Sequence, residues 1–229
     1  MEAIILAGGM GKRLSSVVSN LPKPMATVAG RPFLEILLQS LAAKGFTHVI
    51  LSIGYMAEKI SAHFGNCFAG IELDYSVECD PLGTGGAVAQ AARLAHKDHF
   101  FVFNGDTFLD FDAYAVEVMW QRLRLPVIVA RTVENTERYG RLDTDRGRVL
   151  RFSEKGHVGP GLINAGCYVF HTEQFSDVGL GMRFSLETDF LVQLVERTTV
   201  VLHVADGLFI DIGVPSDYER AQQLLARFA

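Results

Sequence analysis

Short apolar runs alternate with amphipathic segments along the chain, and their order predicts an α/β fold. The first run, Ala3–Ala7, has five consecutive apolar residues, which is typical of a parallel strand buried on both faces. Further strands are predicted at His48–Ile53, Ile71–Val77, His99–Asn104, Val127–Arg131, Leu162–Phe170 and Val200–Val204, with a hairpin over Arg141–Phe152 that turns near Asp145-Arg146-Gly147. Helices are predicted over Phe33–Lys44, Met56–His63, Thr84–Ala95, Asp112–Arg122, Leu186–Glu196 and Ser216–Phe228. This succession predicts a mixed, mostly parallel sheet flanked by helices.

Glycine-rich and polar segments follow three of the predicted strands. They are the loop after Ala3–Ala7, the stretch from Glu78 to Gly86, and Asn104-Gly105-Asp106. Ligands of open α/β sheets bind at the carboxyl ends of the strands. The pattern therefore predicts one site shared by these three segments.

Composition narrows the classes of function. The 229 residues are 49% hydrophobic, which predicts one domain over residues 1–229. A formal net charge of −5 argues against a nucleic-acid binder or a protein of anionic membranes. Three cysteines without a C-x-x-C pair indicate neither a disulfide framework nor a zinc knuckle, so we expect a reducing cytoplasm. No signal peptide or segment of membrane-spanning length is evident.

The first loop carries adjacent cations after its glycines, and a second lysine stands between two prolines in Pro22-Lys23-Pro24. Glycine N–H groups at a strand end can cradle a polyphosphate. A Walker A loop is excluded, because Leu6 stands where its first glycine should be and Arg13 follows Lys12. The dinucleotide-binding pattern G-x-G-x-x-G is also excluded, because a match starting at Gly9 would need glycine at position 14, where the chain has Leu14. A plain glycine turn with a surface lysine remains the alternative.

Several carboxylates and amides lie beside apolar runs. Asp106 and Asp211 each follow such a run, and oxygen ligands of this kind suit Mg²⁺, although turn or helix-capping aspartates are the simpler interpretation. Glu154-Lys155 and Asn164 offer partners for sugar hydroxyls and a phosphate, or they are ordinary surface residues. The run Pro81–Ala87, which follows Glu78, contains three glycines between a predicted strand and a predicted helix. Its bare backbone would let a planar ligand lie against it, or the glycines simply form a tight strand–helix turn.

The motifs together resemble the sugar-1-phosphate nucleotidylyltransferases. That family carries G-G-x-G-T-R-L followed by P-K-P, then P-L-G-T-G-G, E-K, N-A-G and D-I-G-T-P. The chain has all of these in the same order, with Lys12 for the threonine, Val214 for the second threonine and Phe209 where many members have tryptophan. The resemblance implies a Rossmann-like fold that joins a nucleoside triphosphate to a sugar 1-phosphate. It also implies a nucleotide-binding N-terminal half and a sugar-phosphate-binding C-terminal half.

The resemblance assigns roles residue by residue. Catalytic roles fall to Arg13, Lys23 and Asp106, and a Mg²⁺ site falls to Asp106 with Asp211. Nucleotide binding falls to Leu6, Ala7, Gly8, Gly9, Gly11, Glu78, Leu82, Gly83, Thr84 and Gly105, and sugar-phosphate binding to Tyr139, Gly140, Glu154, Lys155 and Asn164. A carboxylate at Glu78 can accept both the N1–H and the N2 amino donors of guanine, which favours GTP.

Within the family, the segment F-I-D-I-G-V-P-x-D-Y most resembles the bacterial guanylyltransferases of D-glycero-D-manno-heptose 1-phosphate, which supply GDP-heptose for surface polysaccharide. Mannose 1-phosphate guanylyltransferases and N-acetylmuramate 1-phosphate uridylyltransferases are the alternatives. A regulatory nucleotide sensor on the same fold is the non-enzymatic alternative. It is disfavoured because a protein that only binds nucleotide would not need all four charged residues, which are Arg13, Lys23, Asp106 and Asp211. The sequence leaves the oligomeric state open, a homo-oligomer included.

Overall fold

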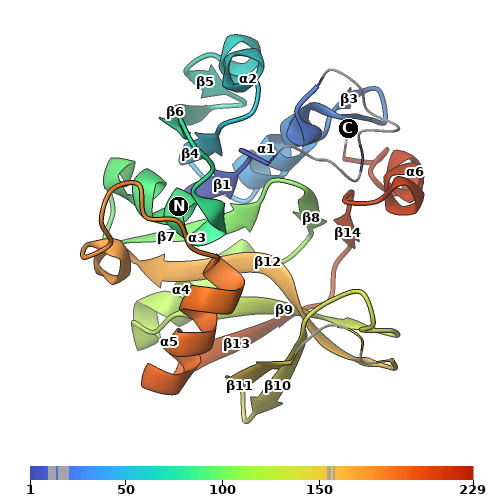
Figure 1. Cartoon of the computed structure of the whole chain (residues 1–229). Coiled ribbons are helices and arrows are strands. Elements are labelled where there is room, and N and C mark those ends of the chain that lie inside the picture. Colours follow the sequence, from blue (N-terminus) through green and yellow to red (C-terminus); the bar gives the residue numbers. More distant parts are fainter. Residues whose placement is uncertain (10–13, 15–20, 154–155, 157, 229) are drawn as a thin grey trace.

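A ten-stranded mixed sheet runs through the computed structural model, which describes residues 1–9, 14, 21–153, 156 and 158–228 (Figure 1). The strands of this sheet are β1 Glu2–Leu6, β4 His48–Ile53, β5 Cys67–Phe68, β6 Ile71–Val77, β7 His99–Asn104, β9 Val127–Val133, β10 Arg141–Asp145, β11 Arg148–Ser153, β12 Gly161–His171 and β13 Val200–Ala205. Their order is β10-β11-β13-β9-β12-β7-β1-β4-β6-β5.

Parallel pairing is concentrated in the block β7-β1-β4-β6, and β13 also runs parallel to β9. Strand β12 is antiparallel to both β7 and β9, and the hairpin β10–β11 and the edge strand β5 are antiparallel too. The parallel block comes from the first half of the chain. The predicted α/β fold with a mixed sheet is therefore confirmed. The expectation of a mostly parallel sheet is wrong, because β12, the β10–β11 hairpin and β5 pair antiparallel, and parallel pairing prevails only where the nucleotide motifs lie.

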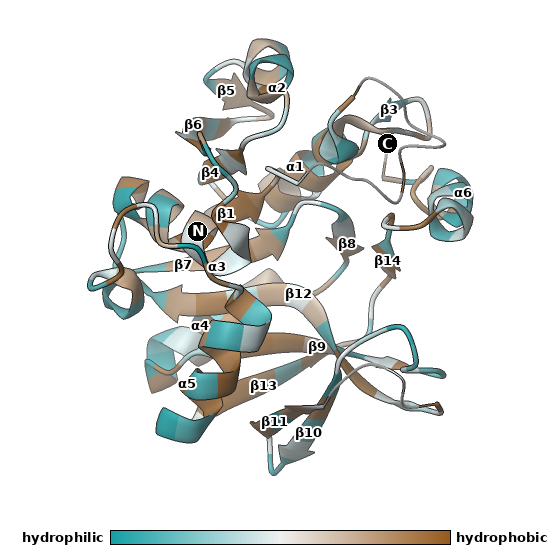
Figure 2. Cartoon of the chain, viewed as in Figure 1, coloured by the Kyte–Doolittle hydropathy of each residue, from teal (hydrophilic) through white to brown (hydrophobic). Residues whose placement is uncertain are grey.

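Helices cover both faces of the sheet because successive strand residues point to opposite sides. Ala3 and Ile5 of β1 pack on one face with α1 Phe33–Ala43, α2 Ala57–Phe64 and α4 Ala113–Leu123. Ile4 packs on the other face with α3 Gly83–Ala91, the 3-10 helix η4 Thr172–Phe175, the π-helix η5 Leu186–Leu191 and α5 Val192–Arg197. Figure 2 shows the central strands mostly in hydrophobic colours and the outlying α6, Pro215–Leu224, mostly in hydrophilic ones.

Two small sheets and a third apolar cluster flank the main sheet. Strands β2 Thr27–Val28 and β3 Arg31–Pro32 form one pair, and β8 Thr107–Leu109 and β14 Phe209–Asp211 form the other. Phe33, Phe108 and Ile210 pack with Ala221 of α6 in the third cluster. This cluster fixes β14 beside β8, and so fixes where Asp211 lies.

Most predicted elements are present with shifted ends, and one has a different form. The predicted helix over Leu186–Glu196 begins as the π-helix η5 before α5 continues it. The predicted helix over Thr84–Ala95 begins one residue earlier, at Gly83, and ends in the short 3-10 helix η3 Ala92–Leu94. The hairpin turns at Arg146-Gly147, both at positive φ (46° and 77°), as a tight turn between β10 and β11 requires.

Candidate functional site

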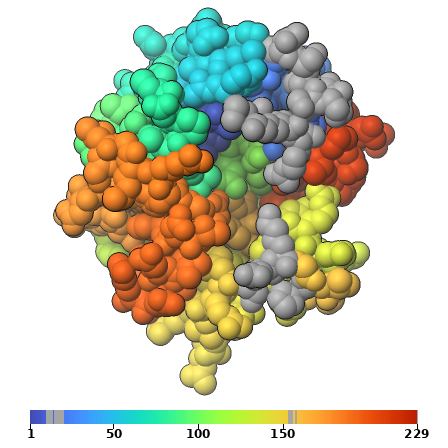
Figure 3. Space-filling view, in the orientation of Figure 1, coloured from blue at the N-terminus to red at the C-terminus, as the bar shows by residue number. Residues whose placement is uncertain are grey.

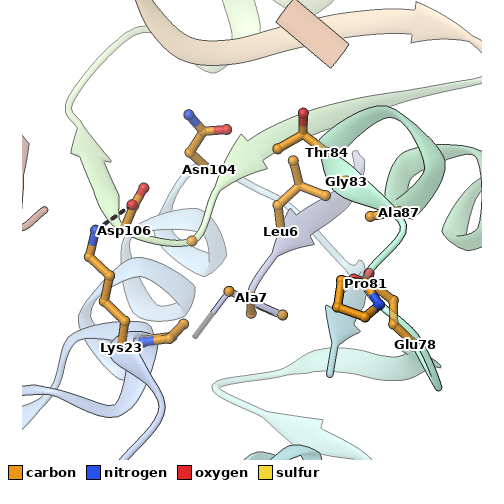
Figure 4. A pocket seen from close by; sticks show the side chains of 14 residues that line it. Leu6, Ala7, Lys23, Glu78, Pro81, Gly83, Thr84, Ala87, Asn104 and Asp106 are labelled. Atoms are coloured by element: carbon orange, nitrogen blue, oxygen red, sulfur yellow. Dashed lines mark hydrogen bonds and ion pairs between the residues drawn. The ribbon is translucent and has the colours of Figure 1, made fainter. Parts of the chain in front are cut away.

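A cavity of about 370 Å³ opens at the carboxyl ends of β1 and β7 (Figure 4). Most of the predicted nucleotide-binding residues line it, together with two predicted catalytic residues: Leu6, Ala7, Gly8, Gly9, Lys23, Glu78, Gly83, Thr84, Gly105 and Asp106. In Figure 4, Lys23 and Asp106 lie on one side, Glu78 and Pro81 on the other, and Leu6 and Ala7 between them. The sequence motifs therefore come together in one cleft.

Glu78 follows β6 directly, and its carboxylate is held by two donors. Ser52 Oγ donates to Oε1 over 3.2 Å, and the Leu82 N–H donates to Oε2 over 3.0 Å. A Cβ on Gly8 would come within 2.7 Å of Oε1, so glycine is required there while the carboxylate keeps this position. Glu78 is half-buried, and these two hydrogen bonds fix the orientation of its carboxylate.

The glycine run at the start of α3 is explained largely by packing. Gly83 has φ +71°, and a Cβ on it would lie 2.5 Å from the Phe184 carbonyl oxygen. The N–H of Gly85 donates to that same oxygen over 3.0 Å, and a Cβ on Gly85 would overlap the Phe184 ring. Figure 3 shows the orange part of the chain, which includes η5, against the green part, which includes α3. Gly83 and Thr84 still line the cavity, while Gly85 and Gly86 accommodate the segment that contains Met182 and Phe184.

Lys23 lies in the short 3-10 helix η2, Lys23–Met25, between two prolines that restrict the backbone. Its Nζ lies 2.5 Å from Asp106 Oδ2 and 3.9 Å from Asp211 Oδ1, and its side chain is only 9% exposed. A Cβ on Gly213 would come within 2.7 Å of Asp211 Oδ1 and 3.2 Å of the Lys23 Nζ. The D-I-G motif therefore supplies both a carboxylate and the space for this ammonium group.

Pairing of β8 with β14 explains how Asp106 and Asp211 meet. Asp211 is the register partner of Thr107, and the Ile212 N–H donates to the Asp106 carbonyl over 2.9 Å. Both carboxylates are partly exposed, at 34% and 26% of their side chains. They face one shared cation, the Lys23 ammonium, and their oxygen donors match the preference of Mg²⁺ for a few carboxylates plus substrate phosphates. The residues present therefore fit a Mg²⁺ site.

A larger cavity, of about 970 Å³, adjoins the first one and shares Asn104 with it. This second cavity is lined by three of the predicted sugar-phosphate-binding residues and by one predicted metal ligand: Tyr139, Gly140, Asn164 and Asp211. Part of its lining is the bulge in β12, where the pairing with β9 shifts between Asn164 and Cys167. Gly166 takes φ +70° there, and a Cβ on it would meet Asn104 Nδ2 at 2.6 Å. The N-A-G motif thus re-aims Asn164 next to the site, a common use of bulges.

Polar side chains around the second cavity are tied to one another. Asn164 Nδ2 donates to the hydroxyl of Tyr168 over 2.7 Å, and burial raises the pKa of Tyr168 well above its usual value. Burial also raises the pKa of Tyr139, whose ring contacts Phe209 edge-on at 5.9 Å between centroids. Both phenols are therefore neutral hydrogen-bonding groups at physiological pH.

Several residues that line the second cavity were not indicated by any motif, among them Arg138, Glu187 and Thr188. Arg138 donates to Asp217 Oδ2 over 2.7 Å, and this bond raises the pKa of the guanidinium. Glu187 Oε2 accepts from Thr84 Oγ1 over 2.8 Å, and Thr188 lies next to it in η5. Glu187 thereby joins the wall of the second cavity to the start of α3. No sequence signal distinguishes it from an ordinary acidic residue in a first helical turn.

Four predicted site residues, Gly11, Arg13, Glu154 and Lys155, lie outside the described residues. Leu82 is described as the residue before α3, where its N–H holds Glu78. In the described part of the chain, one group of three potential metal ligands was found, Glu2, His48 and His96, and it lies at the opposite edge of the sheet. The longest α-helices of the described residues, α1 and α4, have 11 residues each, and none of the described helices qualifies as a membrane span.

Comparisons with known proteins identify the family of the chain. The model of the family described as "Nucleotidyl transferase" matches residues 2–227. The chain is 41% identical, over the full length of both proteins, to a D-glycero-alpha-D-manno-heptose 1-phosphate guanylyltransferase of Aneurinibacillus thermoaerophilus. A protein of the same description from Campylobacter jejuni is 38% identical over 95% of this chain and 97% of its own length. The crystal structure of HddC from Yersinia pseudotuberculosis complexed with GMP-PN superposes with a TM-score of 0.85 and 35% identity, over 98% of this chain and 99% of that one.

Proposed function

Because the chain belongs to the nucleotidyl transferase family, we propose that it transfers GMP from GTP to D-glycero-α-D-manno-heptose 1-phosphate. The products would be GDP-heptose, a precursor for surface polysaccharide, and pyrophosphate. The observation that carries this proposal is the full-length identity of 41% to a guanylyltransferase of that specificity. The exposed thiols of Cys67 and Cys79 suit a reducing compartment such as the cytoplasm.

The two adjoining cavities supply a place for each substrate. The first is lined by residues between Leu6 and Asp106, and the second by residues between Asn104 and Val214. The nucleotide would occupy the first cavity and the sugar phosphate the second, so that their phosphates meet near Asn104 and the two aspartates. An acceptor phosphate oxygen would form the new bond to the α-phosphorus while the bond to pyrophosphate breaks. Such transfers depend on positioning and charge neutralisation more than on covalent help from the protein.

The charged residues divide these tasks. Lys23 would hold the triphosphate and the leaving pyrophosphate, together with Arg13 by resemblance to the family. Asp106 and Asp211 would hold Mg²⁺, which supplies charge neutralisation at the transferring phosphate when bound. Lys155 would hold the attacking phosphate, and Glu154, Asn164, Tyr139 and Gly140 would contact the sugar.

Glu78 would read the base. Each of its oxygens already accepts one protein donor, which fixes the plane of the carboxylate. Each oxygen retains capacity for a second bond, as a carboxylate accepts about four in all. Guanine offers adjacent N1–H and N2 donors that match this pair, whereas uracil and thymine present a carbonyl to one of the two oxygens.

A substrate matrix tests the proposed function. Pyrophosphate release would be measured with GTP, ATP, UTP and dTTP, each against the 1-phosphates of D-glycero-D-manno-heptose, mannose, glucose and N-acetylmuramate, with excess Mg²⁺. We expect the highest kcat/KM for GTP with the heptose 1-phosphate, and GDP-heptose as the product by mass spectrometry. A higher kcat/KM for another pair would refute the assigned specificity. Turnover with none of them, despite GTP binding, would favour a regulatory sensor.

A further inference from the structure

A cluster of side chains that can bind a metal lies at the N-terminal ends of the central strands, the amino edge of the sheet, away from the cleft. Glu2 and His48 begin β1 and β4 and are register partners, and His96 lies in the loop before β7. One ligand atom from each of the three lies within 4.8 Å of the other two. Strand β1 runs from Glu2 to Leu6, so the cluster is about 13 Å from the cleft along that strand.

His48 is oriented as histidines that bind metals usually are. Its Nε2 lies 3.1 Å from Asp74 Oδ2 on β6, and its Nδ1 lies 2.6 Å from Glu2 Oε1. A carboxylate on one ring nitrogen fixes the ring, while the other nitrogen faces the metal; metal-bound histidines almost always have such an outer partner. Asp74 would be that outer partner, which leaves Nδ1 as the ligand atom.

Backbone N–H groups of the loop before β7, which carries His96, hold the Glu2 carboxylate in place. The Glu2 side chain is only 1% exposed, and its two oxygens accept the backbone N–H groups of His96 and Lys97 over 2.9 and 3.1 Å. The same loop stacks the exposed His96 ring on the ring of His48, with centroids 4.4 Å apart and planes 5° apart. A buried carboxylate and two imidazole rings therefore lie together, from two strands and one loop. Because the two rings are parallel, the exposed His96 ring would turn toward His48 Nδ1 for both to bind one ion.

A second histidine at the same edge provides an internal comparison. His99, the first residue of β7, also lies between two carboxylates, at 2.7 Å from Asp98 and 2.9 Å from Glu117. The ring stacked on it belongs to Trp120, which offers no ligand atom. Two carboxylates are therefore enough to hold a buried histidine at this edge. The cluster at Glu2 differs by having a third ligand, His96.

We propose that Glu2, His48 and His96 form a binding site for a Zn²⁺-class transition metal, with solvent as the fourth ligand. Two imidazole nitrogens and one carboxylate suit Zn²⁺, Co²⁺ or Ni²⁺, whereas Mg²⁺ prefers oxygen ligands alone. Tetrahedral Zn²⁺ with bonds of about 2.0–2.1 Å separates its ligand atoms by about 3.3 Å, so binding would widen the contact between His48 and Glu2. The ion would join β1, β4 and the loop before β7, and it takes no part in the proposed transfer reaction.

The test uses the full chain after treatment with a chelator, and Zn²⁺ alone as the probe. Isothermal titration would compare wild type with His96→Ala, since an exposed residue can be truncated without loss of the fold. His63→Ala is the matched control, because His63 is also exposed and pairs with one carboxylate, Glu35, at 2.7 Å. We expect one Zn²⁺ site in wild type and His63→Ala that His96→Ala binds at least tenfold more weakly. Excess Mg²⁺ should not displace the ion.

Two further readouts separate this site from other Zn²⁺ sites. Zn²⁺ should raise the thermal midpoint of wild type more than that of His96→Ala, and Co²⁺ should give a tetrahedral visible spectrum that His96→Ala loses. Zn²⁺ bound at the exposed thiols Cys67 and Cys79 or at the catalytic aspartates would be the same in all three proteins. Equal Zn²⁺ affinity and stoichiometry in wild type and His96→Ala, or no binding to wild type, would overturn the proposal.

Discussion

The ammonium nitrogen of Lys23 lies 2.5 Å from Asp106 Oδ2, and this ion pair joins the proline-bounded loop to the turn after β7. Asp211, from the second half of the chain, approaches the same nitrogen at 3.9 Å. One buried cation thus faces two carboxylates that are suited to a metal ion. We infer that Lys23 partly neutralises this pair until Mg²⁺ and the triphosphate bind, and that it then contacts phosphate.

Replacing Lys23 by Met should impair the use of GTP more than the use of the sugar 1-phosphate. Loss of a charge-assisted contact of about 1.5–3 kcal/mol predicts a rise of roughly 10- to 100-fold in the KM for GTP. The KM for the sugar phosphate should change little. Mg²⁺ should also raise the thermal midpoint of Lys23→Met more than that of wild type, because the two carboxylates then lack their cation.

Lys44→Met is the matched control for Lys23→Met. It removes a lysine whose Nζ lies 2.8 Å from Asp110, outside both cavities, and should leave both KM values unchanged. Steady-state kinetics with each substrate varied in turn provide the measurement. Equal increases of the two KM values in Lys23→Met would show that the lysine does not act on the triphosphate.

Asp106→Asn and Asp211→Asn should each lower kcat/KM by at least about 100-fold at saturating Mg²⁺, since each removes a charge from the two carboxylates proposed to hold the ion. Circular dichroism should show an intact fold, because both side chains are partly exposed. Asp110→Asn provides the same chemical change outside the cleft. Near-normal turnover in either cleft variant would contradict the assigned metal site.

Gly85→Ala tests the packing explanation of the glycine run. The added Cβ would overlap the Phe184 ring, and such overpacking typically costs about 1–3 kcal/mol of unfolding free energy. Gly179→Ala is the control, because a Cβ added to Gly179 would meet nothing within 4 Å. Urea denaturation would measure both variants. A Gly85→Ala protein as stable as the control would show that the Phe184 ring can shift without a loss of unfolding free energy.

His99→Gln tests a charged histidine at the amino edge of the sheet. Burial alone would lower the pKa of His99, but hydrogen bonds to Glu117 and Asp98 outweigh it and raise the pKa above its ordinary value. Protonated His99 should therefore stabilise the fold fully below pH of about 6.5, the ordinary histidine value. This contribution is lost as the pH rises through the folded-state pKa.

The measurement is the free energy of unfolding of wild type and His99→Gln between pH 6 and 9. Two charge-assisted hydrogen bonds are lost in the variant, so we expect a deficit of about 2 kcal/mol or more at pH 6. The deficit should shrink toward pH 9. A deficit that does not change over this range would mean that His99 is neutral in the folded protein.

The sequence predicted the sheet and the first cavity well, because both follow from local patterns. Buried runs such as Ala3–Ala7 indicate parallel strands, and parallel strands end at a common edge. The contact between Asp106 and Asp211 depends on β8 and β14, which have three residues each and no detectable periodicity. Their pairing joins residues far apart in the chain. It was inferred from family resemblance, and no local pattern indicates it.

The second cavity was predicted less completely, for a similar reason. Glu187 lies in a π-helix whose hydrogen bonding has no sequence pattern, and it is placed by its bond to Thr84. The bulge that aims Asn164 at the site depends on pairing between β12 and β9. Such features follow from tertiary packing, which residue spacing alone does not encode.

The proposed recognition of guanine in the first cavity is tested most directly by the nucleotide preference of Glu78→Gln, because Glu78 is the carboxylate proposed to read the base. Values of kcat/KM for GTP, UTP and dTTP would be compared in wild type, Glu78→Gln and Glu72→Gln, the last an exposed glutamate of β6. Wild type and Glu72→Gln should prefer GTP by roughly 10- to 100-fold, which corresponds to about 1–3 kcal/mol for a mismatched polar pair. Glu78→Gln should lose most of that preference with little change in stability. An unchanged ranking of the three nucleotides in Glu78→Gln would contradict the role of this carboxylate, and would leave base recognition to the backbone around Leu82 and Gly83.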